Sequence, residues 1–416
     1  MKRRILSLLL SALMIVGVFS GCSNSETNQN EGTTDGNKSG TVKLTVWGAK
    51  EDKELLEKLA DGFKQKYAAE ATFDIEFAEV SEGDCKNVLL ENPEEGADVF
   101  AFSDDQIRTL VAAGTLSPVV NKDTVSKNNI KGASETATIN GTMYAYPLTA
   151  DNGYFLYYNK AYFTEEDVKT LDAVLAKAAE ANKKVVMDWS SAWYLFTFFG
   201  GTGLQLGLND DGVTNYCTWN SATGDIKGTD VVNAMMAIAS NPGFESKADP
   251  DFINGVKDGS VIAGVFGVWD ATEVEAAWGE NYGATKLPTY TCAGQQIQMT
   301  SFTGYKMIGV NAYSDEQEWA HKLAEWLTNE ESQKTRFVMR GQGPSNINAA
   351  AAPEVAASLA IQAVLEQSQF AVPQRVGGNY WDPVEELGED ILAGRVNSSN
   401  MQDLLDKMVE KVTSTL

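Results

Sequence analysis

Strands and helices alternate along the chain from residue 42 onward, and this order constrains the fold more than any other feature of the sequence. Val42, Leu44 and Val46 alternate with polar residues, as in a half-buried strand. Residues 51–69 then have apolar side chains at helical spacing, and residues 73–80 return to the alternation of a strand. A β-α-β-α order predicts a mostly parallel sheet with helices on both faces. We therefore expect an α/β protein.

The alternation continues through the rest of the chain without a second low-complexity linker. A strand is predicted over residues 305–310, and one long helix or two over residues 315–339. The other predicted elements are strands over 97–102 and 261–268 and helices over 107–113, 167–181, 231–239, 383–393 and 399–414. A length of 416 residues suggests two or three domains. We expect two doubly wound α/β lobes joined by more than one crossing strand, and hence by a hinge.

The first forty residues have the features of an export and attachment segment. A basic start precedes the apolar run Ile5–Phe19, which is too short to cross a bilayer comfortably and is typical of a signal peptide. Phe19-Ser20-Gly21-Cys22 resembles the bacterial lipoprotein cleavage box, with Phe where Leu is usual, and the resemblance implies a lipid on Cys22. Residues 1–22 are thus predicted to be a lipoprotein signal peptide, and the polar residues 23–40 a flexible tether. An ordinary cleaved signal is the alternative.

Charge and composition exclude several classes of function. The chain has 33 Lys and Arg against 57 Asp and Glu, a net charge of −24, which argues against binding of nucleic acid or anionic lipid. The single histidine, His321, excludes mechanisms that need two imidazoles and is expected on a helix surface. Cys85, Cys217 and Cys292 lack a metal-binding spacing, so free thiols are expected, with a Cys217–Cys292 bridge as the alternative.

Motifs for nucleotides, metals and hydrolytic nucleophiles are absent from the sequence. No phosphate-binding loop and no G-x-S-x-G elbow occurs. Asp249-Pro250-Asp251 lacks the closing glutamate of a calcium loop, and we predict a solvated turn there. The sequence therefore predicts no cofactor, no metal and no enzymatic activity, although paired carboxylates keep a glycosidase open as an alternative.

Several tryptophans stand near charged residues, at points where predicted strands or turns end. Of the nine in the chain, these are Trp47, Trp189, Trp193, Trp269 and Trp381. A sugar ring packs its C–H face on an aromatic plane while its hydroxyls bond carboxylates and amides. Core packing is the alternative for any one of them. The pattern favours a carbohydrate-binding site.

Three segments resemble bacterial extracellular solute-binding proteins of the maltodextrin-binding type. Residues 141–160, GTMYAYPLTADNGYFLYYNK, resemble a strand with Tyr-x-x-Pro that crosses between lobes, followed by the Leu-Tyr-Tyr-Asn-Lys strand. Residues 97–105, ADVFAFSDD, resemble a strand that ends at the binding cleft. Residues 320–333, AHKLAEWLTNEESQ, resemble the helix with Leu-Thr-x-x-Glu-x-Gln. The resemblance implies a periplasmic-binding-protein-like fold of class II.

The resemblance also implies how the lobes and the cleft are divided along the chain. The N-terminal lobe would comprise residues 41–150 and 305–353, and the C-terminal lobe residues 151–304 and 354–416. The cleft residues would be Lys50, Glu51, Phe102, Asp104 and Asp105, Asp151 and Asn152 beyond the first crossing, and Trp189, Trp193, Tyr194, Trp269, Asp270, Tyr380 and Trp381 on the second lobe. Trp189 and Trp193 are two candidates for one platform. Phe102 stands where a tryptophan is usual, and the basic residue expected near Gln106 is missing.

The function that the resemblance implies is capture of an oligosaccharide for import. The protein would be a monomeric lipoprotein on the extracellular face of a cytoplasmic membrane, of the Gram-positive type. It would deliver its ligand to the permease subunits of an ABC transporter, whose ATPase is a separate chain. A maltose- or maltodextrin-type α-glucan is the favoured cargo. The alternatives are another sugar, such as a xylo- or galacto-oligosaccharide, a non-sugar solute, a surface glycosidase and an adhesive lipoprotein.

Overall fold

A computed structural model describes residues 40–415 of the chain. The predicted signal peptide, its Cys22 and all of the predicted tether except Gly40 lie outside the described residues. Within residues 40–415, no helix combines the length and the apolar character needed to cross a bilayer.

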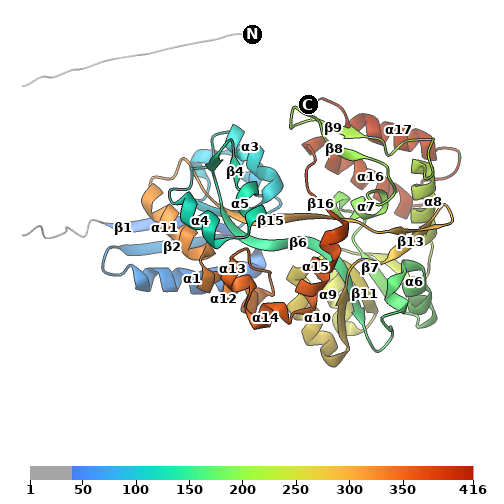
Figure 1. The fold of residues 1–416 in the computed structure, drawn as a ribbon, viewed down its shortest axis with the longest axis horizontal. Coiled ribbons are helices and arrows are strands. Elements are labelled where there is room, and N and C mark those ends of the chain that lie inside the picture. Colours follow the sequence, from blue (N-terminus) through green and yellow to red (C-terminus); the bar gives the residue numbers. More distant parts are fainter. Residues whose placement is uncertain (1–39, 416) are drawn as a thin grey trace, which may run out of the picture. The chain divides into compact units, whose positions relative to one another are not determined.

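One large mixed sheet extends through the described residues. Its main path runs in the order β10 (Phe244–Ser246), β7 (Lys184–Met187), β11 (Val261–Gly267), β6 (Tyr146–Asn159), β15 (Ser301–Val310), β3 (Val99–Ser103), β1 (Thr41–Gly48) and β2 (Thr72–Glu79). In addition, β12 (Tyr282–Thr285) pairs with β6, and β16 (Ala371–Pro373) with β15. Figure 1 shows β6 and β15 passing through the middle of the molecule, between two groups of helices.

The strands β6 and β15 cross from one half of the sheet to the other. Gly153 of β6 pairs with Thr303 of β15, and the second half of β6 pairs with β11 and β12. β15 pairs in turn with β3 and β16. Two crossing strands confirm the predicted multi-strand hinge. The resemblance implied two strands over residues 146–160, but they form one, because the chain stays extended through Asp151 and Asn152.

The strand pairs of the large sheet are antiparallel only where one of the crossing strands, β6 or β15, takes part. The pairs β1·β2, β1·β3, β10·β7 and β11·β7 are parallel, as expected for strands connected by helices. The α/β fold is as predicted, and its sheet is mixed where the crossing strands enter. Three short hairpins lie outside it: β4 (Thr138–Ile139) with β5 (Thr142–Met143), β8 (Leu206–Leu208) with β9 (Asn215–Cys217), and β13 (Thr289–Cys292) with β14 (Gln295–Gln298).

The helices connect these strands and cover the sheet. In the first half of the chain they are α1 (Lys53–Lys66), α2 (Cys85–Glu91), α3 (Ile107–Ala112), α4 (Lys122–Asn128), α5 (Lys131–Thr136), α6 (Leu171–Glu180) and α7 (Ala192–Phe199). The later ones are α8 (Gly228–Ala239), α9 (Asp249–Asp258), α10 (Ala271–Trp278), α11 (Gln317–Thr328), α12 (Glu330–Arg340), α13 (Ile347–Ala350), α14 (Pro353–Ala356), α15 (Leu359–Gln367), α16 (Trp381–Leu392) and α17 (Met401–Val412). The segment predicted as one helix or two is two, α11 and α12.

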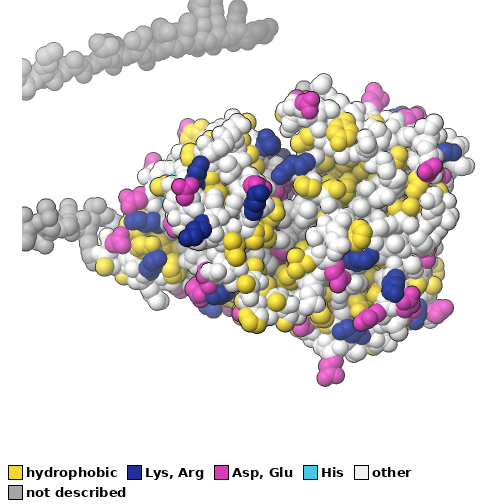
Figure 2. Space-filling view, viewed as in Figure 1, with side chains coloured by type: hydrophobic (Ala, Val, Ile, Leu, Met, Phe, Trp, Pro, Cys, Tyr) yellow, Lys and Arg dark blue, Asp and Glu magenta, His cyan; other side chains and the backbone are white. Residues whose placement is uncertain are grey.

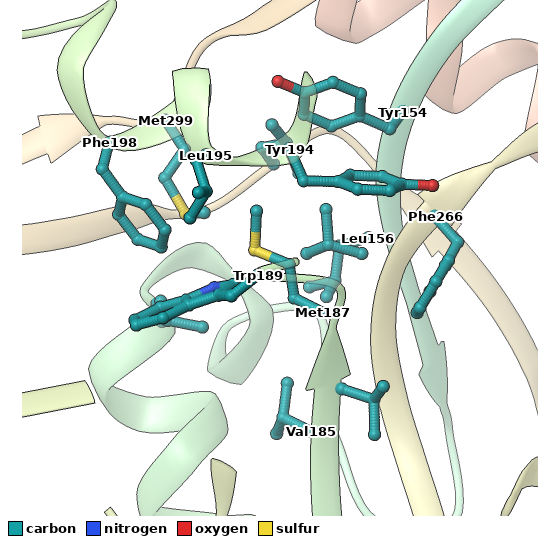
Figure 3. Packing of buried hydrophobic residues seen from close by; sticks show 14 of the residues in the cluster. Tyr154, Leu156, Val185, Met187, Trp189, Tyr194, Leu195, Phe198, Phe266 and Met299 are labelled. Carbon is teal, nitrogen blue, oxygen red and sulfur yellow. The ribbon is translucent and has the colours of Figure 1, made fainter. Parts of the chain in front are cut away.

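Buried apolar side chains form two separate clusters, one around each half of the sheet. The first includes Leu44, Phe63 and Phe100, and the second includes Trp189 and Phe198. Figure 3 shows part of the second cluster, where Trp189 packs among side chains from α7 and β7. Each half of the sheet thus has its own hydrophobic core, while the boundaries given above for the lobes stay a prediction.

Two expectations about single residues were tested by this packing. His321 is buried, which corrects its expected place on a helix surface, because α11 turns that side chain toward β6. Its Nε2 lies 3.0 Å from Ser117 Oγ, and its Nδ1 3.0 Å from the Tyr146 hydroxyl. Cys85, Cys217 and Cys292 are free thiols, so the alternative of a Cys217–Cys292 bridge is wrong.

Candidate functional site

Two tryptophans lie together at the end of strand β11 and the start of helix α7. The ring centroids of Trp193 and Trp269 are 5.8 Å apart, with 36° between the ring planes. Both rings are partly exposed, and both are fixed through the indole N–H. Trp193 Nε1 donates to Gln374 Oε1 at 2.8 Å, and Trp269 Nε1 donates to Asp249 Oδ2 at 2.8 Å. An indole held at its polar edge presents a rigid apolar face, which suits a ligand with apolar and polar sides.

Local sequence explains the position of Trp269. The buried strand β11 ends at Gly267, and the indole folds back against this glycine, where a Cβ would lie 2.1 Å from the ring. Asp249 is the first residue of α9, with Pro250 behind it in the first turn, where a proline is tolerated. The prediction of a solvated turn at Asp249 is therefore wrong, and burial raises the pKa of this carboxyl.

Two carboxylates, Asp104 and Asp105, follow strand β3 in the other half of the sheet, and Asp105 is linked to the tryptophan pair by a side-chain hydrogen bond with Gln374. Asp104 Oδ1 accepts a hydrogen bond of 3.0 Å from the Tyr305 amide, and its Oδ2 lies 3.6 Å from Arg375 Nη1. Burial raises the pKa of Asp104 to about 6. Burial, together with the neighbouring charge of Asp104, raises the pKa of Asp105 to about 7. Asp105 Oδ1 has no hydrogen-bond partner among the described residues, so it is free to accept from a ligand hydroxyl.

Lys306, which pairs with Ser103 of β3, lies between Trp269 and Glu82. Its Nζ lies 3.3 Å from Glu82 Oε1 and 5.2 Å from the ring centroid of Trp269. Lys306 was not predicted for the site, although a lone lysine in the apolar strand β15 is a signal in the sequence that could have found it. Gln374 and Arg375 follow β16 in an irregular segment with no recognisable motif, so the sequence offered no means of finding them.

Three further predicted residues are buried at the crossing or beside Trp269. Asp151 accepts a hydrogen bond from the Gly343 amide, and burial raises its pKa. Asn152 is buried in the same strand, next to Gly304 and Asp104. Asp270 is buried with its Oδ2 unpartnered among the described residues, and burial holds the pKa of this carboxyl well above its usual range.

Other predicted residues lie at the edge of this group or away from it, and among them Tyr194 packs against Trp193 with the ring centroids 5.1 Å apart. Lys50 and Glu51 are exposed, and the buried residue of that segment is Asp52, which forms ion pairs with Arg336 and Arg340 of α12. Arg336 and Arg340 are four residues apart and lie on the same face of α12, and this spacing in the sequence could have indicated a partner carboxylate. Trp381 is partly buried beside Tyr380. Tyr194 is buried between Tyr154 and Phe266.

Three predicted site residues lie inside the hydrophobic cores. Phe102 is fully buried because the strand β3 is covered on both faces. Trp189 is fully buried, with its ring against Phe198 (Figure 3) and Phe244. Trp193 is therefore the partly exposed member of the two candidate platforms. Tyr380 is fully buried, and its hydroxyl donates to the Ala192 carbonyl. None of these three rings has a free face for a ligand, which corrects the expectation for them.

A cavity of about 640 Å³ lies next to this cluster and shares Arg375 with it. Its lining includes Arg108, Phe196, Leu206, Tyr216, Phe302 and Arg375. The hairpin β8–β9 supplies Leu206 and Tyr216, and α3 supplies Arg108 from the other half of the sheet. Figure 2 shows the surface hollowed between the two groups of helices, with basic side chains at the edge of the hollow. No motif in the sequence predicted this part of the site.

The geometry is that of a binding site between two halves joined by crossing strands, and comparison with known proteins agrees. A family model described as "Bacterial extracellular solute-binding protein" matches residues 58–363. The chain belongs to this family. The family and the similar proteins below are solute-binding proteins and not enzymes, which confirms the non-enzymatic prediction and removes the glycosidase alternative. An extracellular or periplasmic location follows from the family.

Similar proteins support both the family and the fold. The galactooligosaccharide-binding protein of Bacillus subtilis (strain 168) is 27% identical over 377 residues, which cover 86% of this chain and 87% of that protein. A structure solved with acarbose is 30% identical, with a TM-score of 0.80, and covers 90% of this chain and 99% of that one. The maltodextrin-binding protein MalE1 from L. casei BL23, solved without ligand, is 24% identical with a TM-score of 0.72, over 91% and 100% of the two chains. The fold predicted from the sequence is confirmed.

Proposed function

We propose that this solute-binding protein captures an oligosaccharide between its two halves and delivers it to an ABC transporter. The observation on which the proposal rests is the pair of rigid indoles, Trp193 and Trp269, together with the buried carboxylate of Asp104 and the partly buried carboxylate of Asp105. Indole faces accept the C–H side of sugar rings, and partly unpartnered carboxylates accept their hydroxyls. Polar contacts to the sugar hydroxyls are needed as well, because stacking contributes only about 0.5–1.5 kcal/mol per aromatic ring, whereas micromolar binding requires roughly 8 kcal/mol.

An α-glucan of the maltose or maltodextrin type is our first choice of cargo. The structure solved with acarbose is the more similar of the two structures compared above, at 30% identity, and the other is of a maltodextrin-binding protein. A galacto-oligosaccharide is the second candidate, because the relative from Bacillus subtilis is named for that ligand. Of the residues predicted for the site, we retain Asp104, Asp105, Asp151, Asn152, Trp193, Trp269 and Asp270, and we add Asp249, Gln374 and the cavity next to Arg375.

Delivery would follow from closure around the ligand. A ligand that contacts both halves only when they are closed stabilises that state by its difference in affinity for the two states. The closed form would then be presented to two permease subunits driven by a separate ATPase. The protein would remain at the extracellular face of the membrane through a lipid on Cys22.

Replacement of Trp269 tests the sugar-binding proposal. Trp269→Ala should weaken binding of the preferred sugar about tenfold, since it removes one stacking platform and the fixed partner of Asp249. The preferred sugar is found first by thermal shift of the wild type against maltose, maltotriose, acarbose and galacto-oligosaccharides, because a ligand stabilises by RT ln(1 + [L]/Kd). Calorimetric titration then gives the affinity of each variant.

Trp319→Ala is the matched control, because Trp319 packs against Phe63 and Phe73 in the hydrophobic cluster around β1 and β3, away from the site. This control should lose stability and keep its sugar affinity. An unchanged affinity in Trp269→Ala, or a wild type that responds to no sugar in the panel, would contradict the proposal.

A further inference from the structure

Lys306 contacts both Trp269 and Glu82, which lie in different halves of the sheet, and its surroundings are unusual for a lysine. Its side chain is only 11% exposed, and that of its ion-pair partner Glu82 only 8%. The ammonium stands over the indole of Trp269 at 5.2 Å from the centroid. A cation at this distance from an indole is attracted by the ring, and the attraction is stronger where water is excluded.

The backbone directs this side chain. In the pairing of β15 with β6, the register shifts between Gly304 and Lys306 and again between Lys306 and Met307. Irregularities of this kind bend a strand locally and re-aim a side chain, and they are frequent beside functional sites. Lys306 is therefore placed over Trp269 by the crossing strand itself, and not by the chance orientation of a surface lysine.

The charges around Lys306 come from both halves of the molecule. Its positive charge favours the ionised forms of Asp52, Asp151 and Asp249. Asp249 is also the acceptor of the Trp269 indole N–H. The ammonium thus lies close to the polar group that fixes the ring, as well as to the ring itself.

Gly267 and Trp193 lie against other parts of the Trp269 ring. A sugar ring and an ammonium cannot occupy the same indole face, so a sugar that stacks on Trp269 has to displace Lys306 from it.

We propose that Lys306 is a placeholder in the binding site, whose ammonium lies over the Trp269 indole and competes with the sugar for it. This inference rests on the proposed function. The competition lowers the affinity for the sugar.

The test compares Lys306→Met with Lys322→Met. The ammonium of Lys322 also lies over an indole, 4.1 Å from the ring centroid of Trp319, which packs on the cluster around β1 and β3. Lys322→Met therefore controls for the loss of a lysine–indole contact outside the site. The first readout is the indole ¹⁵N–¹H signal of Trp269 without sugar, assigned with Trp269→Phe. Lys306→Met should shift this signal, and Lys322→Met should leave it unchanged.

The second readout is the affinity for maltotriose. Lys306→Met should bind about three- to thirtyfold more tightly, which corresponds to a cation–ring attraction of about 0.6–2 kcal/mol. Lys306→Arg keeps a cation that stacks on indoles and should stay within about twofold of the wild type. Because Lys306→Met leaves Glu82 buried without its partner, the double variant Lys306→Met/Glu82→Gln is measured as well.

Three outcomes decide between the proposals. A Trp269 signal that does not respond to Lys306→Met or to the double variant overturns the placeholder. Weaker maltotriose binding in both variants also overturns it, since Lys306 would then be a direct contact of the sugar. If the wild type binds no sugar of the panel, the proposed function fails, while the signal of the unliganded protein still shows whether Lys306 covers the indole.

Discussion

Burial of His321 gives this residue a measurable effect on stability. Burial lowers the pKa of His321 below its ordinary value of 6.5, and both ring nitrogens lie next to hydroxyl groups. The unfolded chain therefore binds more protons than the folded protein below about pH 6.5, so this residue's contribution is present above that pH and is lost as the pH falls. We expect His321→Gln to cost about 1 kcal/mol at pH 7.5 and less at pH 5.

Urea unfolding of both proteins at several pH values between 5 and 7.5 measures this difference. The comparison between the two proteins cancels the opposite effect of Asp104 and Asp105, whose raised pKa values make the folded state less stable as the pH rises through about 6 and 7. A difference in the free energy of unfolding that is the same at every pH would show that His321 does not titrate as inferred.

At the scale of single residues, the sequence predicted the kinds of side chain in the site better than their positions. The predicted residues that lie in the site follow a strand or begin a helix: Asp104 and Asp105 follow β3, Trp269 follows β11, and Trp193 lies in the first turn of α7. Trp189 is flanked by polar residues in the sequence, as expected for a sugar-stacking ring, yet it is buried. Its exposure depends on how α7 packs against it, and the local sequence does not reveal that packing.

At the scale of elements, Asn329 divides the segment between residues 315 and 339 into two helices. Its side chain accepts from the Ser332 amide at 2.9 Å, and its own φ and ψ of −69° and 169° are extended, so it begins α12 as a cap. Asn329→Ala should lower the free energy of unfolding by about 1 kcal/mol, and Asn329→Asp, which keeps the acceptor, should cost much less. Thermal and urea unfolding of the two variants check this, and equal losses would contradict the capping role.

Elements with strong periodicity were predictable, and elements without it were not. The amphipathic helix α1 and the alternating strands β1 and β2 lie within a few residues of their predicted bounds. Helix α7 was not predicted, because its sequence AWYLFTFF is apolar on nearly every face and all of its residues except Trp193 are buried. Helix α9 was missed because its first turn, Asp249-Pro250-Asp251, also fits a turn.

At the scale of the whole molecule, the crossing strands β6 and β15 join the two predicted lobes into one continuous sheet. The sequence predicted two lobes, and two hydrophobic clusters do form. The strand β6 contributes Tyr146 and Leu148 to one cluster and Tyr154 to Leu156 to the other. The contacts of Lys306 with Trp269 and of Arg375 with Asp104 join distant parts of the chain, and no local pattern could predict them.

Attachment of the protein to the membrane is the last property that the proposed function requires. Stable anchoring needs more than one acyl chain, at about 0.8 kcal/mol per buried CH₂, and Cys22 is the cysteine in the lipoprotein-like box. Cys22→Ser should abolish incorporation of labelled palmitate and raise the share of the protein found in the medium. Cys217→Ser, which changes a free thiol of the folded part, should keep both the label and the membrane-bound fraction of the wild type. Label that persists in Cys22→Ser would place the lipid elsewhere, and an unlabelled wild type would favour an ordinary cleaved signal.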